Sequence, residues 1–218
     1  MDYPGDTITD AMVLNFAAEQ TLDGSWCYGA IARSPISEGC IARAAIGARL
    51  LQLYGPPGMK AEFDQRIARA RNYLLETKAK TTDDLAMRLL GLKWVAAEKE
   101  AVASAAKALL EVQRADGGWA GNRYLASDAY STGQAVYALS ESGAAGTGDA
   151  RRRGAAYLLK TQQPDGSWHV KSRAVKFQPY FQSGFPYDHD QWISATATAL
   201  ATMALGNTLP GGVERAAR

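Results

Sequence analysis

Arg153-Gly154-Ala155-Ala156-Tyr157-Leu158-Leu159-Lys160-Thr161-Gln162-Gln163-Pro164-Asp165-Gly166-Ser167-Trp168 is the stretch that decides the fold. It reads as an amphipathic helix that ends at a Gln, followed by a Pro-Asp-Gly turn and a Trp. The end of this pattern, Gln-x-x-x-Gly-x-Trp, occurs three times, beginning at Gln20, Gln113 and Gln162. A repeat of this kind fixes the architecture before any single residue is interpreted.

The residue types of the repeat suit the junction between two helical hairpins. A Gln side chain donates and accepts at once, so it can bridge a helix end to the adjacent turn. Asp-Gly forms the turn, and the Trp supplies a large apolar plate that covers the junction. We therefore assign a structural role, and no ligand contact, to the repeated residues, which are Gln20, Trp26, Gln113, Trp119, Gln162 and Trp168.

Around these turns the chain reads as eight helices in four hairpins, with almost no strand. The predicted hairpins cover about residues 8–55, 61–97, 100–143 and 150–206 of a single domain, after a lead-in at residues 1–7 and before a frayed tail at residues 207–218.

The second hairpin carries a degenerate copy of the repeat. Lys78 takes the Gln position, Thr82 the Gly position and Asp84 the Trp position. Thr82 is expected to cap the helix that follows, with Asp83 and Asp84 stabilising its positive end.

Composition limits the function classes. With 218 residues, 47% of them hydrophobic, the chain can bury a core. The net charge is +2, and the basic run Arg151–Arg153 fits a solvated helix start, so we predict no nucleic-acid partner. No apolar run reaches about 18 residues, so no transmembrane segment is predicted. Without a recognisable signal peptide, the sequence as written predicts a soluble, cytoplasmic chain or a piece of a longer exported protein.

The two cysteines, Cys27 and Cys40, have no second Cys pair or His cluster nearby. Structural zinc is therefore not expected. Of the two remaining states, a disulfide and a pair of buried free thiols, the sequence favours the free thiols.

The stretch from Arg153 to Trp168 resembles the QW motif of squalene–hopene cyclases and their relatives, and the chain looks most like bacterial proteins with prenyltransferase/squalene oxidase repeats. The resemblance implies an all-α fold, an α/α toroid with outer and inner helices and a ligand cavity at the N-terminal ends of the inner helices. Four hairpins form only a partial toroid. An open arc would expose apolar faces, so self-association or a partner chain that completes the toroid is expected.

The resemblance also directs attention to paired acids. Triterpene cyclases protonate a double bond with an Asp-x-Asp-Asp motif at the start of an inner helix. Asp188-His189-Asp190 resembles this motif in part, with Asp190 as the donor and Asp188 and His189 assisting. Asp83 and Asp84 resemble it less, since the first Asp is missing. The alternative for each acid is a helix cap.

Two further groups of residues have functional interpretations. The aromatic side chains of the longest loop either line an isoprenoid cavity or form the loop's own small core; they are Phe177, Tyr180, Phe181, Phe185 and Tyr187. Asp128 and Tyr130 resemble the surroundings of the zinc ligands in protein prenyltransferases, but the Cys is absent. We therefore predict no metal and no cofactor, and zinc-dependent prenyl transfer is the minor alternative.

The sequence thus favours a binding or scaffold module for an isoprenoid, a lipid or a partner protein. The alternative is an active terpenoid cyclase that protonates a polyprenyl substrate through Asp190. The two differ in whether Asp188 and Asp190 point into a closed, aromatic-lined cavity.

Overall fold

The computed structural model describes residues 5–27, 33–36, 39–174 and 181–208, and these residues contain helices and no strand. This confirms the all-α fold class. The odd-numbered helices are α1 (Thr7–Ala18), α3 (Lys60–Glu76), α5 (Lys99–Glu111) and α7 (Gly148–Thr161). The even-numbered helices are α2 (Cys40–Tyr54), α4 (Thr82–Trp94), α6 (Ala129–Ser142) and α8 (Gln191–Gly206). Two 3₁₀ turns, Pro57–Met59 and Asp188–Asp190, precede α3 and α8.

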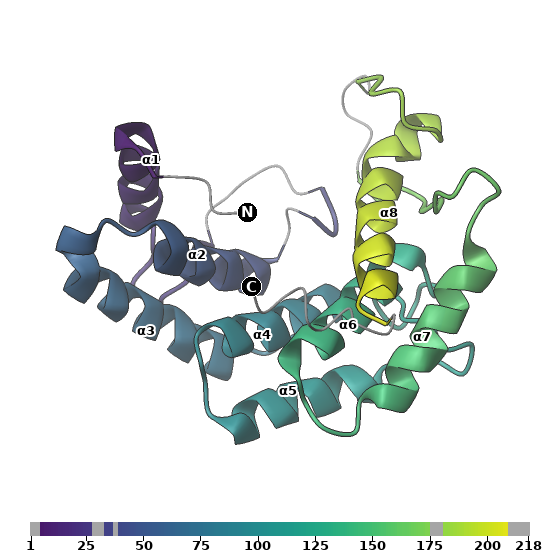
Figure 1. Cartoon of the computed structure of the whole chain (residues 1–218), viewed down its shortest axis with the longest axis horizontal. Helices are drawn as coiled ribbons and strands as arrows, with labels where there is room; N and C mark the ends of the chain where they lie inside the picture. The colour runs from purple at the N-terminus through teal and green to yellow at the C-terminus, as the bar shows by residue number, and fades with distance from the viewer. Residues whose placement is uncertain (1–4, 28–32, 37–38, 175–180, 209–218) are drawn as a thin grey trace.

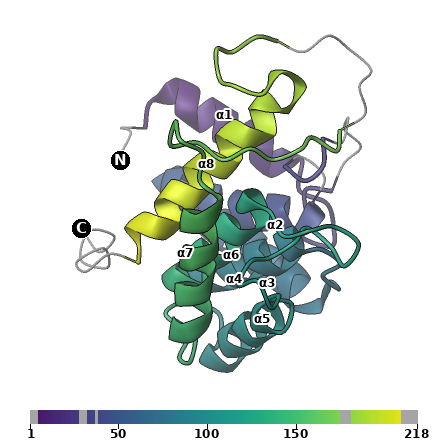
Figure 2. The ribbon, with the colours of Figure 1, turned by 90° about the vertical axis from the view of Figure 1, so that its right-hand side faces the viewer.

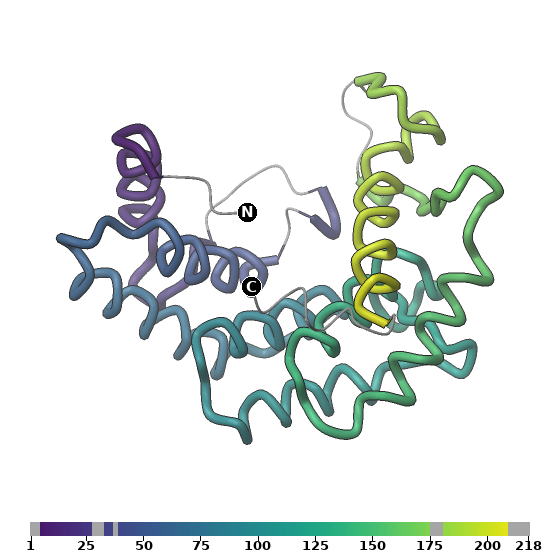
Figure 3. The backbone as a smooth tube through the Cα atoms, viewed as in Figure 1, coloured from purple at the N-terminus to yellow at the C-terminus, as the bar shows by residue number. Residues whose placement is uncertain are grey.

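The helices form an open arc of two layers, as Figures 1 and 3 show. The even-numbered helices are the inner layer, in which α2 packs on α4, α4 on α6 and α6 on α8. The odd-numbered helices pack against the outside of this row, and α1 and α8 lie at its two ends. The turned view in Figure 2 shows α8 crossing at an angle to α7, against which it also packs. The arrangement is of the α/α toroid type.

Small residues let the inner helices approach one another closely. A Cβ added at Gly133 of α6 would lie 2.8 Å from the backbone nitrogen of Ala201 in α8. One added at Gly91 of α4 would lie 2.7 Å from the Cβ of Ala45 in α2. Because interiors pack without gaps, larger side chains at these positions would push the helices apart.

In the copies at Gln20 and Gln113, the Gln connects one hairpin to the next. Gln113 donates from Nε2 to the Gly117 carbonyl at 2.8 Å and to the Ala150 carbonyl, on the next outer helix, at 2.9 Å. Its Oε1 accepts a hydrogen bond from Arg153. Gln20 repeats the pattern, with bonds to the Gly24 and Arg66 carbonyls of 3.1 and 2.9 Å. Each Gln thus holds its own turn and the following outer helix together.

The Trp of each repeat fills the space behind the turn. Each indole Nε1 donates to the carbonyl ten residues earlier on its own outer helix, from Trp26 to Phe16, Trp119 to Leu109 and Trp168 to Leu158. All three Trp side chains are essentially inaccessible to solvent. Burial of an indole with its N–H satisfied contributes a large apolar area at no polar cost.

The cap of α4 lies one residue earlier than predicted. Thr81, and not Thr82, is the N-cap residue, and it forms a reciprocal capping box with Asp84. The Thr82 hydroxyl instead donates to the Ala120 carbonyl at 2.5 Å.

The prediction of free thiols is wrong, because Cys27 and Cys40 form a disulfide. Their Cα atoms lie 5.0 Å apart, within the range that a disulfide spans. Cys27 is exposed at the end of the first Gln–Trp turn, and Cys40 is the first residue of α2. Spacing along the chain could not reveal this proximity, because it depends on how α2 returns to the turn.

The end of the arc at α1 and α2 exposes apolar side chains, among them Ile8, Met12 and Leu53. Association through this face remains a prediction. None of the described helices is long and apolar enough to cross a membrane.

Replacing Gln113 with Ala should lower the free energy of unfolding by about 2–3 kcal/mol, because two partly buried carbonyls and an Arg lose their partner. Gln162 is the matched control. It is exposed and bonds the Gly166 carbonyl at 2.9 Å, so Gln162→Ala should cost about 1 kcal/mol or less. Urea unfolding followed by circular dichroism measures both. Equal losses would show that the bridge to the next hairpin contributes nothing.

Candidate functional site

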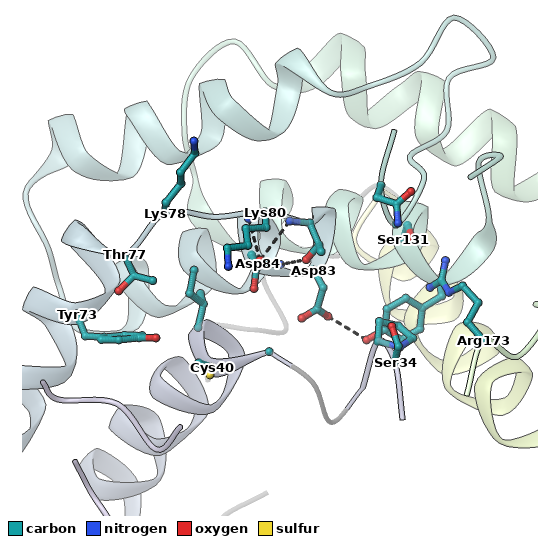
Figure 4. A pocket seen from close by; sticks show the side chains of 17 residues that line it. Ser34, Cys40, Tyr73, Thr77, Lys78, Lys80, Asp83, Asp84, Ser131 and Arg173 are labelled. Atoms are coloured by element: carbon teal, nitrogen blue, oxygen red, sulfur yellow. Dashed lines mark hydrogen bonds between the residues drawn. The ribbon is translucent and has the colours of Figure 1, made fainter. Parts of the chain in front are cut away.

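A cavity of about 370 Å³ lies at the N-terminal ends of α2, α4 and α6. We call it the acid cavity, since Asp83 and Asp84 of the first turn of α4 face it (Figure 4). Lys78 and Lys80 line it on one side and Arg173 on the other.

Asp83 is buried, with 7% of its surface exposed. Its Oδ1 accepts hydrogen bonds from the Tyr130 hydroxyl at 3.0 Å and from Nε2 of Gln134 at 2.8 Å, both on α6. The arrangement therefore holds Asp83 as an acceptor that joins α4 to α6.

Asp84 is engaged by the backbone of its own cap. Its Oδ2 accepts from the backbone N–H of Lys80 at 2.9 Å and of Thr81 at 3.1 Å. Both carboxylates of the cavity thus have donors supplied by the protein.

Tyr130 supplies the hydroxyl donor from α6. Burial, and next the negative charge of Asp83, raise the pKa of Tyr130 well above its ordinary value. The hydroxyl therefore keeps its proton at neutral pH and serves as a permanent donor to Asp83.

The cations of the cavity are less engaged than its acids. Lys78 and Lys80 are exposed, and their ammonium groups make no hydrogen bond or ion pair to the described residues. The guanidinium of Arg173 lies 3.7 Å from Oδ2 of Asp128, a long contact for an ion pair.

The degenerate repeat explains why polar residues gather here. In the complete copies a buried Trp follows the turn, and a long loop then leads to the inner helix. Residues 77–81 instead join α3 directly to α4, and Asp84 stands where the other copies have Trp. This junction has no indole to fill it, and the lysines of the short link border the cavity together with the acids of the first turn of α4.

The structure places Asp188, His189 and Asp190 away from the acid cavity. Asp188 and His189 are exposed in the 3₁₀ turn before α8. Asp190 lies 2.8 Å from Nε2 of His169 and accepts from the backbone N–H of Ser172 at 2.8 Å. None of the three lines the acid cavity. A catalytic role for them remains a prediction.

The predicted aromatic residues gather only in part. Phe177 and Tyr180 lie outside the described residues, and Phe181 is 87% exposed. Tyr187 stacks on His169 with 4.6 Å between ring centroids, and Phe185 meets Tyr187 edge-on. These contacts are made within the loop region and do not reach the acid cavity.

Asp128 and Tyr130 belong to different surroundings. Tyr130 lines the acid cavity, whereas Asp128 lines a second cavity of about 540 Å³ beside α7. Asp128 caps α6 by accepting from the backbone N–H of Ser131 at 2.7 Å, and burial raises its pKa. In the same cavity burial raises the pKa of Tyr157 to about 12, and its hydroxyl donates to the Ser127 carbonyl.

No group of three or more His, Cys, Asp or Glu side chains within the described part of the chain is placed to hold a metal ion. Sequence reasoning missed the positive side chains of the acid cavity and the amide of Gln134. The one available signal was the acid pair at the degenerate repeat, since nothing in the sequence places α6 or Arg173 beside it.

Residues 42–208 match the family model of the squalene-hopene cyclase C-terminal domain. The match runs from the first turn of α2 past the end of α8 and includes the acid cavity's two carboxylates. No curated protein matches the chain.

Asp128→Asn tests the burial of that carboxyl group. Because its pKa is raised in the folded state, Asp128 contributes stability below the unfolded value near 3.8, and this contribution is lost as pH rises through the folded pKa. Asn keeps the cap without ionising. The free energy of unfolding of Asp128→Asn, relative to wild type, should therefore increase with pH, by at most about 1.4 kcal/mol per pH unit.

Asp165→Asn is the control with the opposite sign. Hydrogen bonds from the Ser167 hydroxyl and backbone lower the pKa of Asp165, so its contribution is present above 3.8 and lost as pH falls. Urea unfolding between pH 3 and 7 measures both variants. A flat or falling relative stability of Asp128→Asn would contradict the assignment.

Proposed function

The chain belongs to the family of the squalene-hopene cyclase C-terminal domain, and on that premise we propose that it is a binding module that takes the anionic head group of an isoprenoid or lipid into the acid cavity. The observation that carries the proposal is that the acids of the cavity have hydrogen-bond partners within the protein and its lysines do not. Protein donors already engage Asp83 and Asp84, while Lys78 and Lys80 are free to meet an anion.

The charges of the cavity support binding better than cationic cyclisation. Oδ1 of Asp83 already accepts two hydrogen bonds, from Tyr130 and Gln134, so this oxygen is engaged by the protein and not presented to a substrate double bond. A carbocation would also lie near three positive side chains, which repel it. Among the residues that the structure describes, Tyr73 and Tyr130 are the aromatic side chains that line the acid cavity, so this part of the chain offers few aromatic faces to a cation.

Cyclisation through Asp83 is the second candidate function. It is favoured by one observation: the Thr81–Asp84 stretch occupies the start of an inner helix, and its third residue, Asp83, is buried. The resemblance to triterpene cyclases predicts the acid motif at this place, the start of an inner helix. Asp190, the donor expected from the sequence, faces His169 and the loop that contains Ser172 instead.

Binding can be measured with farnesyl diphosphate as the probe. Farnesol, which has the same isoprenoid tail without the anionic group, is the control ligand. We expect the diphosphate to bind and the alcohol to bind at least about tenfold more weakly. Lys78→Gln combined with Lys80→Gln should weaken diphosphate binding about tenfold, or about 1.4 kcal/mol, by calorimetry.

The matched control combines Lys93→Gln with Lys99→Gln. These lysines are exposed, do not line the acid cavity and remove the same charge. Equal weakening in both double variants, or equal binding of the alcohol, would overturn the role of the cavity.

Product analysis separates the two candidates. Wild type incubated with squalene or shorter polyprenyl substrates should yield no cyclised product by gas chromatography and mass spectrometry. Asp83→Asn and Asp190→Asn are run beside it. Product that disappears in Asp83→Asn alone would establish the cyclase and refute the binding module, and loss in Asp190→Asn alone would assign the chemistry to Asp190.

A further inference from the structure

A cavity of about 670 Å³ lies between the start of α4, the end of α5 and the loop that leads from α5 to α6. We call it the basic cavity, because three of the described residues that line it are positively charged and none is acidic. The three cations are Lys80, Arg114 and Arg123. Lys80 and Asn122 also line the acid cavity, so the two cavities are neighbours.

The cations of the basic cavity form no ion pair with the described residues. Arg114 donates from Nη2 to the carbonyl of Asn122 at 3.2 Å and to that of Arg123 at 3.3 Å. Arg123 donates to the Tyr124 hydroxyl, and its guanidinium carbon lies 4.7 Å from the centroid of the Tyr124 ring. Carbonyl and hydroxyl partners leave the positive charges uncompensated. Because like charges repel, an anion bound among them would be stabilised.

The loop from α5 to α6 is fixed to the start of α4 by hydrogen bonds of its backbone. The backbone N–H of Thr82 donates to the Gly121 carbonyl at 3.1 Å, and the Thr82 hydroxyl donates to the Ala120 carbonyl at 2.5 Å. Within the loop, the backbone N–H of Tyr124 donates to Oδ1 of Asn122 at 2.9 Å. A site whose side chains stand on a fixed backbone loses less conformational entropy when a ligand binds.

Apolar surface borders the cations. Leu85 and Val112 line the basic cavity, and 42% of Val112 is exposed. Tyr124 lines it as well and is 79% exposed. Apolar side chains in contact with water beside a group of cations suit a ligand that joins an anionic group to an apolar one. An aromatic group on such a ligand would stack against the exposed Tyr124 ring.

We propose that the basic cavity is a separate binding site, which takes a small organic phosphate monoester that carries an aromatic group. A phosphate monoester has a charge of about −1.5 to −2 at neutral pH and three oxygens that accept hydrogen bonds. It therefore compensates three cations better than a single carboxylate does. In the bonds described above, Arg114 and Arg123 use only Nη2, so their Nε and Nη1 groups are left to donate to the phosphate.

Phenyl phosphate is the probe, and inorganic phosphate and phenol represent its two halves. Binding is followed through the amide chemical shifts of residues 120–125 in NMR spectra of isotope-labelled protein. Phenyl phosphate should shift these resonances with a Kd at least about tenfold lower than that of inorganic phosphate, because only the ester also contacts the apolar side chains. Phenol, which lacks the anion, should produce no shift.

Two variants separate the contributions of charge and ring. Arg123→Gln should weaken phenyl phosphate binding about tenfold, and Arg123→Lys, which keeps the charge, should weaken it less. Tyr124→Ala should weaken phenyl phosphate binding about fivefold and leave the binding of inorganic phosphate within about twofold of wild type. Both side chains are exposed, so the fold should persist, which circular dichroism checks.

Lys78→Gln is the matched control. Lys78 is exposed and lines the acid cavity but not the basic cavity, so its loss should leave phenyl phosphate binding unchanged. Lys80 is left intact, because it lines both cavities. Equal weakening by Lys78→Gln and Arg123→Gln would overturn the proposal, since it would indicate a general attraction of the anion to the positive surface. The absence of any shift at residues 120–125 would overturn it too.

This site does not depend on the proposed function, and the two can fail separately. If farnesyl diphosphate does not bind while phenyl phosphate still shifts residues 120–125 through Arg123, the proposed function fails and the basic cavity stands. If phenyl phosphate produces no shift there while farnesyl diphosphate binding depends on Lys78 and Lys80, the basic cavity fails and the proposed function stands.

Discussion

The rest of the arc depends on one interaction, the hydrogen bonds made by the side-chain amide of Gln113 and, in the first hairpin, of Gln20. It donates to the carbonyl of its own turn Gly and to a carbonyl of the next outer helix. An Arg of the next hairpin donates a hydrogen bond back to the same Gln. Arg69 donates to Gln20 at 3.0 Å, and Arg153 donates to Gln113. The Gln–Arg contact therefore joins the first hairpin to the second and the third to the fourth, whereas Lys78 takes the Gln position between the second and the third.

The same junction requires Gly in the turn. Gly24 and Gly117 adopt positive φ values of 91° and 86°, and a Cβ at either would lie within 2.7 Å of a backbone carbonyl oxygen on the next outer helix. The third copy shows the contrast. Gly166 keeps the positive φ, but the nearest atom is 3.9 Å away, because the described chain has no further outer helix there. The positive φ of the turn and the close approach of the next outer helix are thus two separate reasons for Gly, and both apply in the first two copies.

The difference between repeated contacts and single contacts decides what the sequence could predict. The Gln, Gly and Trp spacing recurs along the chain, so the helical hairpins and their layers could be predicted from it. The contacts of the acid cavity belong to no recurring pattern. Tyr130 and Gln134 reach Asp83 across 47 and 51 positions, and the repeat does not specify either contact. The Cys27–Cys40 bond could not be predicted for a related reason, since it depends on how α2 returns to the first Gln–Trp turn. Asp190 was more suggestive than Asp83 in the sequence because aromatic residues precede it, yet Tyr187 contacts His169 and Phe185, and Phe181 is exposed.

The degenerate repeat connects architecture to the site. A complete copy fills its junction with a Trp whose indole donates a hydrogen bond to the outer helix. The copy at Lys78–Asp84 gives up that apolar contact and puts charged groups in its place, which costs stability unless each is satisfied. Asp83 and Asp84 are satisfied by Tyr130, Gln134 and the backbone, so the fold tolerates them without outside help. Lys78 and Lys80 reach solvent, so water can solvate their charges and they need no partner within the protein. In the proposed function, a position released from packing in this way presents charge to a ligand, so the weakest copy of the repeat, and not the strongest, provides the binding site.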